Sequence, residues 1–267
     1  MLYDAHVHLA DARLRAKLPA IRASYEAIDL GRAIVVGTGP NDWPEVIRIA
    51  RSDSRFLPAI GLHPWQSREA PQGWREDFEN HLDQGIRIIG EIGLDQCFDH
   101  HDIDMQLEIF RWQFEHATKH NLPTTVHCLK AHEALLQTLQ EAAIPKRGFA
   151  LHAYNGPTDT IDPLLEMGAY FSINGGQLKS NARRVRSLIR AVPDDRLLIE
   201  TDAPDFLPPP SQQVYTLQKK RETPAEALNH PGNLRAGYKA IALERGCSMA
   251  KLTECVSDNF IRYFLDD

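Results

Sequence analysis

The sequence lacks the features that mark several large classes of protein. Its 267 residues contain no apolar run of 18 residues, so no transmembrane helix and no membrane partner are expected. Only four cysteines are present, Cys97, Cys128, Cys247 and Cys255, and no C-x-x-C pair occurs. This favours a reduced, cytoplasmic protein whose cysteines are small core residues. The net charge of −6 argues against tight non-specific binding of nucleic acid by bulk charge, although a local basic patch is compatible with it.

A glycine-rich dinucleotide fingerprint is also missing, because the turn after the first apolar run reads HVHLADA. Short apolar runs, rich in β-branched and aromatic residues, instead alternate with charged stretches of helical spacing. The runs predict strands at residues 2–6, 33–37, 56–62, 86–92, 123–127, 148–152, 169–173 and 197–200. The stretches predict helices at residues 42–52, 74–84, 103–120, 132–142, 182–191 and 233–245, and an extra C-terminal helix at 249–264. Asp102 or Asp104 is expected to cap the helix at 103–120, and Asn41 or Asp42 the helix at 42–52.

Eight strands that alternate with about eight helices predict an α/β fold with a parallel sheet. The sheet is either open and doubly wound or closed into a (β/α)8 TIM barrel. Eight units in 267 residues give about 33 residues per unit, which favours the barrel. No linker divides the chain, and the proline-rich residues 203–224 predict a long loop after the last strand. We therefore expect one barrel domain over residues 1–267.

Histidine is the residue type in excess, with 12 copies, and five of them lie at or just after the ends of predicted strands. These five are His6, His8, His63, His127 and His152. In a barrel the carboxyl ends of the strands meet at one rim, where Glu91 and Asp202 are also expected. Imidazoles and carboxylates that face one cavity are ligands for Zn, Mn, Fe or Co. One cation cannot use all of them with good geometry, but two cations about 3.5–4 Å apart and bridged by a carboxylate can.

Other interpretations of single residues stay open. Any one of the five histidines is compatible with a hydrogen-bonded place in the core, and only the joint pattern favours a metal site. His63, beside Pro64, is a loop residue, a support for a ligand or a substrate contact. Four histidines in helical stretches are interpreted as solvated or packed, namely His81, His116, His120 and His132, and a cap or substrate contact is considered for the loop pair His100 and His101.

A basic segment at residues 179–190 begins with Lys179 and carries four arginines. It predicts a solvated amphipathic helix with Val185, Leu188 and Ile189 packed inward. The alternative is that its start lies at the rim and binds phosphate groups. Trp65, directly after His63 and Pro64, either packs at the rim or stacks on a nucleobase.

Several motifs together resemble a known family. They are D-x-H-x-H at residues 4–8, GLHP at 61–64, GEIGLD at 90–95, the strand-ending His127, H-x-Y-x-G at 152–156 and ETDAP at 200–204. Their order and spacing, from about Asp4 to Phe264, resemble the TatD family of metal-dependent deoxyribonucleases in the amidohydrolase-like barrel superfamily. GEIGLD and ETDAP are the most specific of these motifs.

The resemblance implies a ligand set and a chemistry. His6, His8 and Asp202 match ligands of a first metal site, and Glu91 matches a bridging carboxylate. His127 and His152 match ligands of a second site, and His63 matches a histidine near the substrate. Members hydrolyse phosphodiester bonds, often in DNA from the 3′ end, and use Mg, Mn or Zn. The sequence departs from the family pattern at Gln96, Leu129 and Leu228, so Lys130 or residues 179–190 are the alternatives for phosphate contacts.

The expected function is therefore metal-assisted hydrolysis of DNA or another phosphodiester by two divalent ions. Glu91, Asp202 and His63 are the expected catalytic residues: Asp202 positions a water and accepts its proton, and His63 helps to polarise the oxygen that gains charge. A hydrolase of amides, lactones or other esters on the same barrel is the alternative. A nucleic-acid or protein-binding module with a vestigial metal site is the third. The sequence predicts no oligomeric state.

Overall fold

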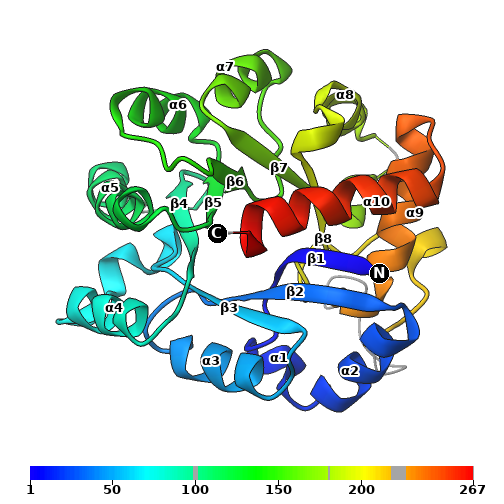
Figure 1. Ribbon diagram of the computed structural model, residues 1–267, viewed down its shortest axis with the longest axis horizontal. Coiled ribbons are helices and arrows are strands. Elements are labelled where there is room, and N and C mark those ends of the chain that lie inside the picture. Colours follow the sequence, from blue (N-terminus) through cyan, green and yellow to red (C-terminus); the bar gives the residue numbers. More distant parts are fainter. Residues whose placement is uncertain (99–101, 180, 218–226, 267) are drawn as a thin grey trace.

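The computed structural model describes residues 1–98, 102–179, 181–217 and 227–266. Within these residues, eight parallel strands follow one another in chain order around a single sheet (Figure 1). They are β1 (Leu2–Val7), β2 (Leu30–Val36), β3 (Phe56–Ile60), β4 (Ile88–Asp95), β5 (Thr124–Leu129), β6 (Phe149–Leu151), β7 (Ala169–Asn174) and β8 (Leu197–Glu200). The predicted strand at residues 197–200 is confirmed at both ends, and the others differ by a few residues.

The sheet closes nearly completely where β8 meets β1. The backbone N–H of Asp202 donates to the carbonyl of His6 at 3.0 Å, and that of His8 donates to the carbonyl of Ala203 at 2.9 Å. These two bonds join the carboxyl ends of the first and last strands. The predicted (β/α)8 barrel is therefore confirmed, and its closing seam lies at the rim where the histidines were expected.

Helices surround the sheet (Figure 1). They are α1 (Ala12–Arg15), α2 (Leu18–Ala27), α3 (Trp43–Arg51), α4 (Trp74–Asp83), α5 (Ile103–His120), α6 (His132–Glu141), α7 (Ile161–Glu166), α8 (Arg183–Ala191), α9 (Leu234–Arg245) and α10 (Met249–Phe260). The bounds of α5 are as predicted, and its cap is Asp102, whose carboxylate accepts from the N–H of Met105 at 3.1 Å. The spacing pattern does not single out α1 and α7, because four and six residues are too few to show a period. It also misses α2.

The expected capping of α3 is wrong in its detail. Asp42 occupies the cap position, but its carboxylate makes no bond to the helix. It turns back to the preceding loop instead, where it accepts from the N–H and hydroxyl of Thr38. The side chain thus fixes the loop after β2 rather than the first turn of α3.

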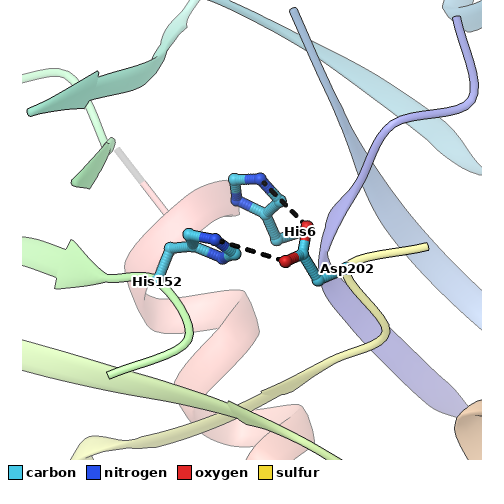
Figure 2. A group of neighbouring side chains, drawn as sticks. All are labelled: His6, His152 and Asp202. Atoms are coloured by element: carbon cyan, nitrogen blue, oxygen red, sulfur yellow. Dashed lines mark ion pairs between the residues drawn. The ribbon is translucent and has the colours of Figure 1, made fainter. Parts of the chain in front are cut away.

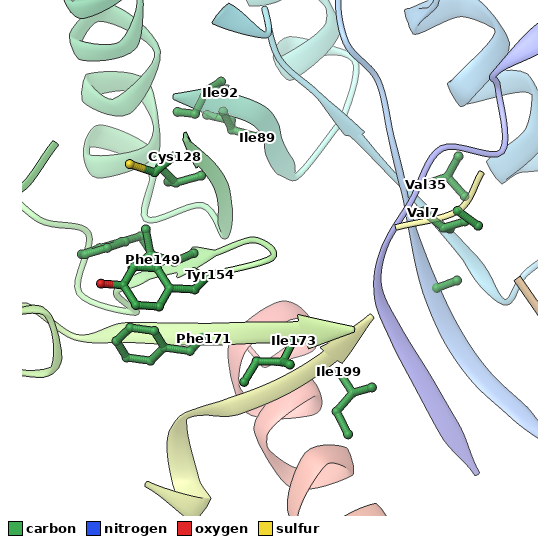
Figure 3. Packing of buried hydrophobic residues seen from close by; sticks show 14 of the residues in the cluster. Val7, Val35, Ile89, Ile92, Cys128, Phe149, Tyr154, Phe171, Ile173 and Ile199 are labelled. Carbon is green, nitrogen blue, oxygen red and sulfur yellow. The ribbon is translucent and has the colours of Figure 1, made fainter. Parts of the chain in front are cut away.

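Apolar side chains fill the space between sheet and helices, as Figure 3 shows for Phe149, Phe171, Ile173 and Ile199. A second cluster joins the starts of several strands to the C-terminal segment. In it, Tyr3 of β1 lies against Phe260, and Tyr170 of β7 lies against Tyr263, with ring centroids 4.7 and 4.6 Å apart. The predicted extra helix is confirmed as α10, which continues as a π-helical turn over Ile261–Leu265 and covers the amino ends of the strands.

No helix among the described residues combines the length and the apolar character that crossing a bilayer requires. The predicted loop after β8 is irregular over its described part, apart from the short turn Pro210–Gln212. Residues 218–224 of that loop lie outside the described residues.

The hydroxyl of Tyr263 ties the C-terminal segment to the sheet. It donates to the carbonyl of Thr124 at 2.7 Å and accepts from the N–H of the same residue at 2.8 Å, in a fully buried position. Tyr263→Phe removes both of these buried bonds to the backbone of Thr124, so we expect it to lower the free energy of unfolding by about 1–3 kcal/mol. Urea unfolding of the two proteins measures the difference. A loss below about 0.3 kcal/mol contradicts the assignment.

Candidate metal centre

Glu91 lies at the centre of the rim, because five imidazole rings from four strand ends converge on its carboxylate. Its Oε2 is 3.3 Å from Nε2 of His6 and 3.5 Å from Nε2 of His8. Its Oε1 is 2.8 Å from Nδ1 of His127, 3.4 Å from Nε2 of His63 and 3.6 Å from Nε2 of His152. Glu91 itself is 2% exposed. The structure therefore brings together all five histidines that the strand ends predict.

Asp202 faces the same cavity from the end of β8 (Figure 2). Its Oδ1 is 3.4 Å from Nε2 of His8 and 3.9 Å from Nε2 of His6, and its Oδ2 is 3.5 Å from Nε2 of His152. The backbone of Asp202 is left-handed, with φ of 49°, and its N–H is the donor that closes the barrel onto His6. The closing seam thus fixes where this carboxylate points.

Glycine allows the strand that carries Glu91 to approach its neighbour. Gly93 in β4 has φ of +147°, and a Cβ there would lie 2.0 Å from the carbonyl oxygen of His127 in β5. A larger residue would push the two strands apart at the point where Glu91 and His127 meet. The first glycine of the motif, Gly90, is confined in the same way, because its Cβ would overlap the hydroxyl of Thr125.

Hydrogen bonds on the outer side of the rings fix two tautomers. Nδ1 of His8 lies 3.1 Å from the carbonyl of Val36, which can only accept, so the proton of His8 is on Nδ1. Nδ1 of His152 lies 3.1 Å from Oε2 of Glu200 and donates in the same way. In the neutral rings, Nε2 of both histidines then presents a lone pair to the cavity. Carboxylates and carbonyls behind metal-binding histidines act in this manner.

His63 differs from His8 and His152 because its proton is on the ring nitrogen that faces the cavity. Its Nδ1 accepts from the backbone N–H of Trp65 at 3.1 Å, so its proton is on Nε2, which faces Glu91. Burial, helped by the positive charge of His127, lowers the pKa of His63 to about 4, so the ring is neutral at pH 7. His63 is thus a hydrogen-bond donor to the cavity, which suits the predicted role beside the substrate better than metal ligation.

The charges of the cavity are strongly coupled. Burial opposes ionisation of Glu91 and Asp202, but the histidines around them outweigh it and hold the pKa of both carboxyls below the usual range. Burial likewise opposes protonation of His8 and His152. The carboxylates that face them prevail and raise the pKa of His8 to about 9 and that of His152 to about 10. Without a cation, protons thus hold these acceptors together.

The donor set fits a divalent cation. Three groups of ligand atoms lie within 4.8 Å of one another: His6, His8 and Glu91; His63, Glu91 and His127; and His6, His152 and Asp202. In addition, Nε2 of His6 and Nε2 of His8 face each other at 3.2 Å. Lone pairs of nitrogen and oxygen that converge in this way repel unless a cation lies between them, and mixed N and O ligands suit Zn²⁺ or Mn²⁺. His152 reaches both Glu91 and Asp202, so it borders both sets of predicted ligands.

A cavity of about 150 Å³ opens above these groups. Trp65 stands at its mouth, 60% exposed, and Leu129, Asp205 and Phe206 form part of its wall. Lys130 and Lys179, the predicted phosphate contacts, are exposed and do not line the cavity. A charged loop residue near the rim can point to solvent as easily as to the site, and the sequence pattern does not distinguish the two.

Three buried carboxylates beside the ligands were not predicted as site residues: Asp4, Asp95 and Glu200. Glu200 orients His152, and Asp95 accepts from Nε2 of His127 at 2.8 Å. Asp4 accepts from the backbone N–H of Thr201 at 2.9 Å and so supports the closing seam. A signal does exist in the sequence, since Asp4 precedes His6, and Glu200 precedes Asp202, by two residues and so shares the face of the ligand.

The other predictions near the site have mixed outcomes. In α8, Leu188 and Ile189 are buried, and Arg186 and Arg190 pair with Glu244 of α9, as a solvated amphipathic helix requires.

The prediction that all four cysteines are core residues is wrong. Cys128 is buried within β5, but Cys97 is exposed, and Cys247 and Cys255 are partly exposed. His81, His116, His120 and His132 lie in helices as expected, and His100 and His101 lie outside the described residues.

Comparison with known proteins decides the family. The family model described as TatD related DNase matches residues 3–265. The chain belongs to the TatD family. The motif resemblance is thereby confirmed. A metal-dependent hydrolase of Bacillus subtilis strain 168, YabD, is 31% identical over 216 residues, which cover 79% of this chain and 83% of that protein.

Further TatD relatives agree with this assignment. The 3′-5′ ssDNA/RNA exonuclease TatD of Edwardsiella piscicida is 27% identical over 210 residues, covering 78% of this chain and 81% of that protein. The crystal structure of YjjV, a TatD homologue from Escherichia coli K12, superposes with a TM-score of 0.88 at 21% identity and covers 100% of this chain and 98% of its own. The chain is thus a metal-dependent hydrolase of the TatD family on the family's barrel.

Metal binding at this centre is expected to release protons at neutral pH. His8 and His152, with pKa values raised to about 9 and about 10, carry protons at pH 7 that a cation must displace. We expect about one to two protons released per Zn²⁺-loaded centre at pH 7, and fewer as the pH rises through 9 and 10.

Calorimetric titration of metal-free protein in buffers of different ionisation enthalpy measures the release. The variant Glu200→Gln removes the carboxylate that faces Nδ1 of His152 and should release fewer protons at the same pH. Zinc binding without any proton release at pH 7 contradicts this account of the cavity.

Proposed function

We propose that this protein is a divalent-metal-dependent phosphodiesterase that removes nucleotides from the 3′ end of single-stranded DNA. The observation that carries the proposal is the single carboxylate, Glu91, within 3.6 Å of five imidazole rings, with Asp202 opposite it. The naming of a relative as a 3′-5′ ssDNA/RNA exonuclease supports the choice of substrate.

Six side chains would hold two divalent ions. His6, His8 and Asp202 form one set, His127 and His152 form the other, and Glu91 has one oxygen toward each. Bound there, the ions would supply Lewis-acid chemistry, which lowers the pKa of a water and stabilises negative charge on a phosphoryl oxygen. Mg²⁺, Mn²⁺ and Zn²⁺ are the proposed ions.

The other roles follow from the polarity of each side chain. Oδ2 of Asp202 accepts the proton of the attacking water, since the surrounding histidines outweigh the effect of burial and keep this carboxyl ionised at pH 7. Nε2–H of His63 donates to the phosphoryl oxygen that gains charge. Trp65, exposed at the mouth, supplies a flat surface for the terminal base.

Cleavage of a single-stranded oligonucleotide labelled at its 3′ end tests the proposal. Metal-stripped protein should be inactive, and separate addition of Mg²⁺, Mn²⁺ or Zn²⁺ should restore stepwise removal of 3′ nucleotides. Asp202→Asn should lose about 10²–10⁴-fold in kcat, because it cannot accept the proton.

Asp53→Asn is the matched control for this assay. Asp53 pairs with Arg55 just before β3, at the opposite end of the strand from the site, and its loss should leave cleavage unchanged. Equal cleavage by wild type and Asp202→Asn, or cleavage that persists after metal removal, contradicts the proposal.

A second candidate is hydrolysis of an uncharged ester, lactone or amide by the same centre. The observation that favours it is the wall of the cavity, in which the described part of the chain places no lysine or arginine. The acidic residue of the wall, Asp205, already pairs with Arg13. Phosphate groups would then depend on the metal ions alone for neutralisation.

A substrate panel separates the two candidates. We expect the metal-loaded enzyme to cleave an oligonucleotide and a simple phosphodiester, and to leave a lactone, a dipeptide and a carboxylic ester intact. Turnover rates under identical metal concentrations provide the measurement. Inertness toward every phosphodiester together with turnover of one of the others establishes the second candidate.

A further inference from the structure

The indole of Trp65 is exposed yet anchored. Its Nε1 donates to Oδ2 of Asp95 at 2.8 Å, and its backbone N–H donates to Nδ1 of His63. Its ring lies 4.6 Å from that of His63 and 6.1 Å from that of His127, measured between centroids. An exposed aromatic side chain held at both ends of the residue loses little further freedom when it binds a ligand.

Asp95, which holds the indole of Trp65, also accepts hydrogen bonds from two other groups. Its Oδ2 accepts from Trp65 and also from Nε2 of His127, both at 2.8 Å, and its Oδ1 accepts from the N–H of Cys97 at 2.7 Å. Asp95 is fully buried. Its own backbone is held by Gln106 of α5, which accepts from its N–H at 2.8 Å and donates to its carbonyl at 2.9 Å.

The bond to Asp95 decides which nitrogen of His127 can bind a cation. Nε2 lies 2.8 Å from Oδ2 of Asp95 and Nδ1 lies 2.8 Å from Oε1 of Glu91, so each nitrogen faces a carboxylate oxygen. When a cation binds beside Glu91, only the nitrogen that faces it must give up its proton, and the bond to Asp95 keeps the other proton on Nε2. Nδ1 then presents its lone pair to the cation. Reversing the tautomer would place a proton on the ligand atom and close this position to a metal.

We propose that Asp95 is a positioning residue with two effects. It presents Nδ1 of His127 as a metal ligand, and it holds the indole of Trp65 as a rigid platform for a planar ring of the substrate. The first effect depends only on metal binding, whereas the second rests on the proposed function, in which that ring is the terminal nucleobase.

Asp95→Asn tests the first effect, since neither orientation of an amide satisfies all three donors. An NH₂ at Oδ2 opposes the N–H groups of Trp65 and His127, and an NH₂ at Oδ1 opposes that of Cys97. We expect Zn²⁺ affinity, measured by calorimetry with a competing chelator, to fall about 10- to 100-fold. Asp53→Asn is the control and should bind Zn²⁺ as the wild type does.

Fluorescence gives a readout that needs no turnover. The fluorescence anisotropy of Trp65 is obtained by subtracting the emission of the Trp65→Phe variant from that of the same protein with Trp65 present. The subtraction removes the contribution of the other tryptophans, Trp43, Trp74 and Trp112. In the Asp95→Asn background this anisotropy should fall, because the released indole moves on the nanosecond scale. A purely structural role of Asp95 predicts lower stability with unchanged anisotropy at 25 °C.

Trp65→Ala tests the platform. We expect KM for the oligonucleotide to rise about 5- to 100-fold, kcat to stay within about twofold, and Zn²⁺ affinity to be nearly unchanged. Trp65→Phe keeps the ring but removes the N–H that Asp95 holds, so KM should rise by less. Because Trp65 is exposed, this variant carries the test of the anchor if Asp95→Asn does not fold.

Each half of the proposal has its own contrary result. Zn²⁺ affinity of Asp95→Asn within about twofold of the wild type overturns the role at His127. Unchanged KM in Trp65→Ala and Trp65→Phe overturns the platform. If the wild type cleaves no oligonucleotide, the platform falls with the proposed function, while Zn²⁺ affinity and anisotropy still decide whether Asp95 positions His127.

Discussion

The contact of one buried carboxylate, Glu91, with five imidazole rings is the constraint on which the rest of the structure depends. A carboxylate and several ring nitrogens within 3.6 Å are stable in a buried position only if protons or cations lie between them. The raised pKa values of His8 and His152 show that protons fill this role when no metal is bound. The fold therefore encloses a cluster of carboxylates and ring nitrogens that positive charge stabilises.

Further buried carboxylates hold the ligand side chains of the barrel in place around Glu91. Glu200 fixes His152, Asp95 fixes His127, and Asp4 supports the seam that places Asp202 beside His6. Each is fully or almost fully buried, and each belongs to a motif that also supplies a ligand. A short motif at a strand end thus carries both a ligand and a supporting carboxylate, and the C-terminal segment secures the opposite end of the barrel.

Much of the fold follows from local pattern, because apolar runs and helical spacing report which faces are buried. The long helix α5 and the strand β8 were predictable at both ends, whereas β4 continues past the predicted residue 92 through Gly93, a residue that normally argues against a strand. The convergence of the histidines was predictable from barrel geometry. The bond between Asp95 and Trp65 was not, since it joins the last residue of β4 to a turn 30 residues earlier in the chain. The outward direction of Lys130 and Lys179 has no sequence signal either.

Anomalous diffraction from crystals grown with Zn²⁺ tests the central claim most directly. The account predicts two strong peaks in the cavity, one bordered by His6, His8, Glu91 and Asp202, and the other by Glu91, His127 and His152. His63, whose Nδ1 is held by the N–H of Trp65, is expected to lie outside the coordination of both. The account also predicts that Glu91 contacts both peaks. No peak in this cavity, or a single ion coordinated without Glu91, would contradict it.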